Sequence, residues 1–82
     1  MQFPQFLSSN LLPFLMARYC ENVSKYQTSD KTESQFSLLC KIRDTEKRII
    51  ALYAKSTNRK ITEISPEMAR RIFEILDLPV ID

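Results

Sequence analysis

The chain contains no glycine among its 82 residues. Glycine adopts positive φ angles without steric cost, so tight hairpin turns and phosphate-binding loops usually depend on it. This chain must build any left-handed backbone position from Asn or Asp instead. The P-loop and the glycine-rich dinucleotide-binding fingerprint are therefore excluded.

Histidine is absent as well. It is the commonest general base near neutral pH and the commonest protein ligand of transition metals, so its loss removes the Ser-His and Cys-His catalytic arrangements. The acidic residues do not replace it. Asp44 and Glu46 are two positions apart and do not share a helical face, and Glu63 and Glu67 flank a predicted helix start, where carboxylates are favoured electrostatically. We expect a protein that is not an enzyme and that has no catalytic residue, metal, cofactor or small-molecule substrate.

The composition is that of one small globular domain covering residues 1–82. Hydrophobic residues make up 44% and charged residues 27%, and no internal repeat or linker divides the chain. A domain of this size buries about 60–65% of the surface that its unfolded chain exposes, which gives a thin margin of stability. A protein partner or self-association would extend the core.

Apolar residues dominate the first part of the chain, but they predict neither a membrane span nor a signal peptide. The segment lacks a basic leading region and a small-residue cleavage pattern, and Pro4 and Pro13 interrupt it. It is also shorter than the roughly 20 apolar residues that a bilayer requires. We expect a cytoplasmic protein without membrane contact, in which Cys20 and Cys40 are reduced and pack in the core as small hydrophobes.

Two helices are clear from the spacing of apolar residues. The first covers about 11–26, with Asn10 as the expected N-cap and an apolar stripe at three- and four-residue steps. The second covers about 66–77, where Ser65 and Pro66 form a typical helix start. An apolar tail follows, which we expect either to fold back on the core or to be bound by a neighbour. The two stripes are Leu12, Leu15, Met16, Tyr19, Val23 and Tyr26, then Met68, Ala69, Ile72, Phe73 and Leu76.

Residues 36–55 between them fit two incompatible structures. Residues 36–43 alternate between apolar and polar side chains, as in a strand, and residues 44–47 would then form a hairpin turn. If residues 36–55 form a helix instead, most of their apolar side chains lie on one side of it, and Thr45 and Glu46 are the polar exceptions on that side.

Three features favour the helix. Thr32 and Gln35 have the spacing of a capping box, Asn58 is suited to a left-handed helix end, and a tight hairpin would normally use glycine. We therefore predict an all-α fold of three helices, at about 11–26, 33–57 and 66–77, with a long central helix. The alternative is an α+β fold, α-β-β-α, with a hairpin at 44–47.

Positive charge is concentrated in residues 41–60, which hold seven basic and two acidic side chains. Such a segment is able to follow a phosphate backbone, so nucleic-acid binding is one hypothesis. A solvated helix surface with an Asp44–Arg48 pair explains the same residues, and the chain as a whole carries a formal net charge of just +2. The candidate contacts to nucleic acid or to an acidic partner are Arg43, Lys47, Arg48, Lys55, Arg59 and Lys60.

The apolar N-terminal part holds more large side chains than one face of a short helix can bury. Exposed apolar patches usually mark protein–protein contacts. We therefore expect a non-enzymatic protein–protein interaction module, either a small subunit or regulator of a larger assembly or a self-associating domain. In the alternative, Phe3 and Phe6 fold back over the helices. The candidate partner-binding residues are Phe3, Phe6, Leu7, Leu11 and Phe14.

Overall fold

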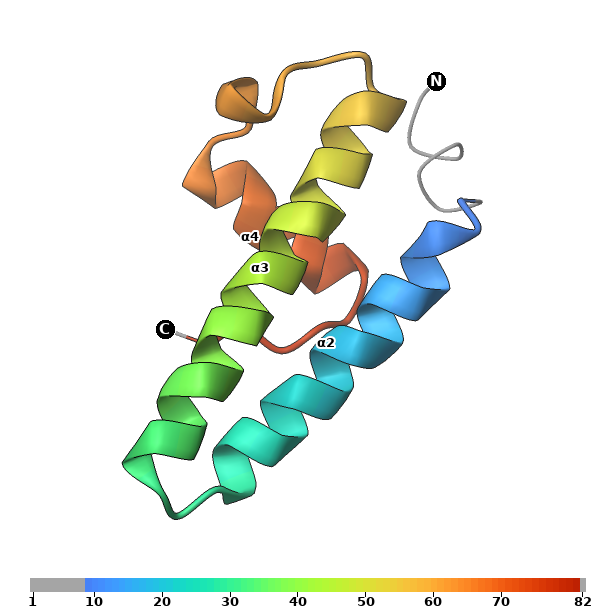
Figure 1. Ribbon diagram of the computed structural model, residues 1–82. Helices are drawn as coiled ribbons and strands as arrows, with labels where there is room; N and C mark the ends of the chain where they lie inside the picture. Colours follow the sequence, from blue (N-terminus) through green and yellow to red (C-terminus); the bar gives the residue numbers. More distant parts are fainter. Residues whose placement is uncertain (1–8, 82) are drawn as a thin grey trace.

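The computed structural model describes residues 9–81, which form an all-α structure without a β-strand (Figure 1). The predicted three-helix fold is confirmed, with helix bounds within two residues of those expected. The α-β-β-α alternative with a hairpin at 44–47 is wrong, because these residues lie in the middle of the long central helix. The elements are α2 (Leu11–Thr28), α3 (Thr32–Ser56), the short 3-10 helix η1 (Ile61–Glu63) and α4 (Pro66–Ile75).

Helices α2 and α3 form an antiparallel pair, joined by residues 29–31 (Figure 1). The shorter α4 lies behind this pair in the same view and crosses it. The long hairpin makes the molecule elongated, with extents of 44 × 23 × 17 Å.

The core lies where the three helices meet. Tyr19, Ile42 and Ile49 are fully buried there. The rings of Tyr19 and Phe73 meet edge to face, with centroids 5.2 Å apart and planes at 78°, an arrangement that the charge distribution of aromatic rings favours. The other buried residues of this cluster are Leu12, Val23, Ile72, Leu76 and Leu78.

The two polar exceptions in the pattern of α3 point toward the inside of the fold. Thr45 is 2% exposed, and its hydroxyl donates to the carbonyl of Lys41 at 2.9 Å. Glu46 accepts hydrogen bonds from Arg43 on the same helix. Because these polar groups have hydrogen-bond partners, burying them costs little, and the helix continues through the residues where a turn was the alternative.

The C-terminal ends of α3 and α4 are built without glycine. Asn58 after α3 and Asp77 after α4 have φ angles of 56° and 58°. Each occupies the left-handed position of a Schellman motif, in which the next residue's N–H bonds back to the last turn. The N–H of Arg59 donates to the carbonyl of Ala54 at 2.8 Å. At the end of α4, the N–H of Leu78 donates to the carbonyl of Phe73 at 2.9 Å, and that of Asp77 to Glu74 at 3.0 Å.

The helix starts follow the predictions in part. Ser65 caps α4, and its hydroxyl accepts from the N–H of Met68 at 3.1 Å. Asn10 occupies the N-cap of α2 but makes no side-chain capping bond. The hydroxyl of Ser9 accepts from the N–H of Leu11 at 3.3 Å instead.

The predicted capping box at the start of α3 is wrong. Lys31 occupies the N-cap, and Thr32 is already the first helical residue. The side chain of Gln35 donates to the carbonyl of Ser29 at 3.0 Å. The helix therefore begins one residue earlier than expected, and Gln35 ties it to the loop from α2.

The expected core packing of the two cysteines is also wrong, because Cys20 and Cys40 are both exposed. Cys20 directly follows the buried Tyr19, and one residue corresponds to a rotation of about 100° around a helix. Cys40 precedes the buried Ile42 by two residues, which places it about 200° from the core-facing direction.

We expect both thiols to react completely with a thiol reagent in the native protein, at rates close to those measured in denaturant. Their exposed positions leave no barrier of local unfolding before the reaction. Spectrophotometric thiol titration of the native protein and of Cys20→Ser and Cys40→Ser variants measures each thiol. Strong protection of either one would contradict its exposed position.

Replacing Asn58 by glycine should raise the free energy of unfolding by about 0.5–1 kcal/mol, since glycine accepts a positive φ without steric cost. Asn58→Ala should lower it by about 1 kcal/mol. Urea unfolding followed by circular dichroism measures both. The matched control is Asn22→Gly, at an ordinary helical position of α2, which should lower the stability by a few tenths of a kcal/mol. A glycine variant at position 58 that is no more stable than the wild type would contradict the account of this helix end.

Candidate functional site

The predicted partner-binding residues fall into two groups in the structure. Phe3, Phe6 and Leu7 lie outside the described residues. Leu11 and Phe14 lie on the first turns of α2, and their side chains are 61% and 75% exposed. Being three residues apart, they are neighbours on the helix surface. This end of α2 therefore presents apolar surface to solvent.

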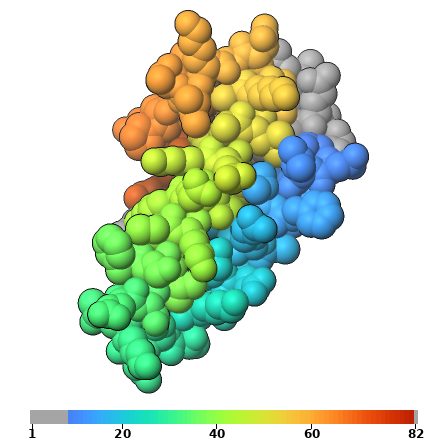
Figure 2. All heavy atoms as spheres, viewed as in Figure 1, coloured from blue at the N-terminus to red at the C-terminus, as the bar shows by residue number. Residues whose placement is uncertain are grey.

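Next to Leu11, an open hollow of about 320 Å³ lies between α2 and α3. Four of its six lining residues are apolar, and the other two are cationic residues of α3. None of its lining residues belongs to α4. Figure 2 shows a face of the molecule on which α2 and α3 lie side by side, with α4 largely hidden behind them. We call this hollow the α2–α3 groove; it is lined by Leu11, Leu15, Arg48, Ala51, Leu52 and Lys55.

A second, polar hollow continues along the same two helices toward their connecting loop. Its lining comes from the middle of α2 and the first half of α3. The two hollows use residues that recur at three- and four-residue steps, so they lie on one stripe of each helix. We call the two hollows together the α2–α3 seam. The stripes are Leu11, Leu15, Arg18 and Asn22 on α2, and Lys41, Thr45, Arg48, Leu52 and Lys55 on α3.

Positive charge predominates along the seam. Its two carboxylates are both engaged, since Asp44 pairs with Arg48 at 3.0 Å and Glu21 pairs with Lys25 at 3.0 Å. The hydrogen bond and charge of Lys25 lower the pKa of Glu21, with a further contribution from Arg18. These exposed pairs add little stability, but they neutralise the negative charge of the seam.

Two lysines of the seam have no acidic partner among the described residues. Among residues 9–81, Lys41 and Lys55 form no ion pair, and both side chains are exposed. They lie 14 positions apart on α3, which is about 21 Å along a helix axis. An anionic partner lying along the seam would meet one of them near each end.

The basic residues predicted as one surface are divided between the sides of α3. Arg48 and Lys55 belong to the α2–α3 groove. Arg43 and Lys47 line a hollow on the side that faces α4. Arg59 and Lys60 lie in the segment after α3, where the guanidinium of Arg59 is 3.9 Å from the sulfur of Met68.

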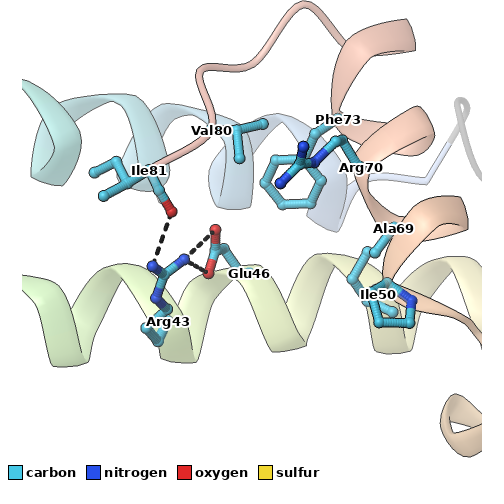
Figure 3. Close-up of a pocket in the computed structure, with 9 residues that line it drawn as sticks. Arg43, Glu46, Ile50, Ala69, Arg70, Phe73, Val80 and Ile81 are labelled. Carbon is cyan, nitrogen blue, oxygen red and sulfur yellow. Dashed lines mark hydrogen bonds and ion pairs between the residues drawn. The ribbon is translucent and has the colours of Figure 1, made fainter.

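The side of α3 that faces α4 holds a different cavity, the α3–α4 pocket, of about 350 Å³ (Figure 3). Val80 and Ile81 form one wall of this pocket. The C-terminal tail therefore folds back on the helices, which is the first of the two arrangements expected from the sequence. Arg43 donates to Glu46 at 2.9 and 3.1 Å and to the carbonyl of Ile81 at 2.8 Å. The guanidinium of Arg43 therefore holds the tail in place.

Tyr19 completes this arrangement from α2. Its hydroxyl donates to the carbonyl of Pro79 and lies 3.4 Å from a carboxylate oxygen of Glu46. Burial and the negative charge of Glu46 raise the pKa of Tyr19 above its usual range. The sequence pattern placed Tyr19 on the apolar stripe, but nothing in that pattern indicated that its hydroxyl would bind the tail.

Residues 9–81 contain no group of three or more Cys, Asp or Glu side chains that could hold a metal ion. Within the same residues, no helix has the length and apolar character needed to cross a membrane.

Comparisons of the chain with protein-family models, with curated proteins and with solved structures found no match.

Alkaline pH should destabilise the fold through Tyr19. Because its pKa is raised in the folded state, its contribution to stability is fully present below about pH 10 and is lost as the pH rises beyond that value. We expect the wild type to lose more stability between about pH 8 and pH 11 than a Tyr19→Phe variant, which has no phenol to ionise. Urea unfolding at both pH values measures the difference. Equal losses in the two proteins would show that Tyr19 is not the responsible group.

Proposed function

We propose that this protein is a non-enzymatic protein–protein interaction module that binds a partner protein through the α2–α3 groove. In this role it serves as a small subunit or regulator of a larger assembly. We also propose a cytoplasmic location, where the exposed thiols of Cys20 and Cys40 stay reduced.

The observation that carries the proposal is the exposure of Leu11, which lines a largely apolar hollow, and of Phe14, its neighbour on the surface of α2. At 61% and 75% exposed, these side chains contribute little to the core. Ala51 is also exposed, and Leu52 is half-buried. Apolar side chains from two helices that meet at one surface hollow are typical of a protein-binding site, where Phe and Leu serve as anchors in the buried centre.

The charge distribution favours a protein over a nucleic acid. Arg43 is bound to Glu46 and to the tail, and Arg48 is paired with Asp44. Of the remaining candidates, Lys47 and Lys55 lie on separate sides of α3, and Arg59 and Lys60 lie in the segment after it. A phosphate backbone is best followed by a continuous row of cations. Lys55 beside the apolar groove fits the rim of a protein interface, which is usually polar.

A symmetric pair formed by two copies through this groove is less favourable than binding to another protein. Two-fold symmetry would bring the same surface of both copies together. The side chains of Arg48 and Lys55 from each copy would then face one another, and like charges oppose such an arrangement.

The test compares two double variants of equal chemical change. Leu11→Ser with Phe14→Ser alters a groove residue and its exposed neighbour, while Phe36→Ser with Ile75→Ser alters two other exposed apolar residues, 69% and 56% exposed. Both variants should keep the stability of the wild type within about 0.5 kcal/mol per substitution, because the residues are exposed. We expect the first variant alone to lose its partner.

The measurement is affinity capture from the native host after nuclease treatment, followed by reconstitution with the purified partner. A partner that binds the wild type and the Phe36/Ile75 variant but not the Leu11/Phe14 variant supports the proposal. Equal binding by both variants would place the interface elsewhere. Loss of every bound protein on nuclease treatment would favour nucleic-acid binding instead.

A further inference from the structure

We infer that the α2–α3 seam binds one amphipathic α-helix of another protein, with acidic residues flanking its apolar stripe. This inference rests on the proposed function and specifies the partner's chemistry and shape.

The shape of the fold favours a helix as the occupant. Helix α4 has 10 residues, against 25 in α3, so it is about 15 Å long and packs on part of the α2–α3 pair. Residues of α2 and α3 alone line both hollows of the seam. A helix laid into the seam would pack its side chains between those of two antiparallel helices, as in a helix bundle.

The order of residues along the seam specifies the stripe of the bound helix. The end with Leu11, Leu15 and Leu52 is apolar, and the end with Asn22 and Thr45 is polar. The bound helix should therefore carry apolar anchors at i, i+3 or i+4, and i+7 toward one end. The span from Lys41 to Lys55 corresponds to about four turns of helix.

The charges of the seam indicate that the bound helix has acidic residues on both sides of its apolar stripe. Four cations face two carboxylates, and both carboxylates already form ion pairs. An acidic helix adds favourable pairs at Lys41 and Lys55, which have none with the described residues, whereas a basic helix meets like charge along the whole seam.

The same charges argue that the helix belongs to another protein rather than to a second copy. Helix α2 carries two basic and one acidic residue, α3 carries five and three, and α4 carries two of each. None of these helices has a net negative charge. A second copy therefore offers no described helix with the required acidic flanks.

The experiment uses two synthetic helical peptides of four to five turns with the same leucine stripe, flanked by glutamate in one and by lysine in the other. Fluorescence anisotropy measures their binding to the full chain at low salt. We expect the glutamate peptide to bind at least about tenfold more tightly than the lysine peptide, with an affinity that falls as salt is added. A Lys41→Glu, Lys55→Glu variant should reverse this preference.

The matched control is Lys47→Glu with Arg71→Glu, which makes the same charge change away from the seam and should leave the preference unchanged. Circular dichroism checks that each variant is folded. Equal binding of both peptides, or an unchanged preference in the Lys41/Lys55 variant, would overturn the inference. Absence of binding by either peptide would overturn it too, while the proposed function would still be decided separately by the Leu11/Phe14 variant and the natural partner.

Discussion

The buried side chain of Tyr19 holds both long helices and the C-terminal tail in one arrangement. Its ring packs edge to face with Phe73 of α4, 5.2 Å between centroids, and its hydroxyl donates to the carbonyl of Pro79. Glu46 lies beside that hydroxyl and accepts from Arg43, which in turn donates to the carbonyl of Ile81. No described buried side-chain nitrogen or oxygen lacks a hydrogen-bond partner. This series of hydrogen bonds fixes the tail without the cost of unsatisfied buried groups.

This arrangement gives the two sides of α3 different roles. On the side toward α4, Arg43 and Glu46 are used internally, and the tail forms a wall of the α3–α4 pocket (Figure 3). On the side toward α2, Lys41 and Lys55 remain exposed beside apolar residues of both helices. The basic character of residues 41–60 is therefore divided between internal structure and an accessible surface that borders the apolar groove of the proposed interaction.

The candidate site could be predicted from the sequence in part. Leu11 and Phe14 were expected at a partner surface because the N-terminal part holds more apolar residues than the core can accept, and both are exposed. Ala51 and Leu52 were not expected there, since residues 49–54 are apolar all round the helix and their pattern does not show which face lies inside. Cys20 and Cys40 were placed in the core from the usual burial of cysteine, although each lies on a helix face turned away from it.

The sequence by itself determined where α2 and α4 lie and which kinds of residue end the helices. Its apolar spacing indicated α2 and α4 but left a helix and a hairpin open for residues 36–55, and the absence of glycine leaves Asn and Asp for the left-handed positions, which Asn58 and Asp77 occupy after α3 and α4. These are local properties, because propensity, capping and backbone sterics act within a few residues. The tertiary structure alone decided that Thr45 is buried, that Arg43 holds the tail, and that the seam faces away from α4. Such outcomes depend on contacts between residues far apart in the chain, such as Tyr19 with Pro79, which no local pattern encodes.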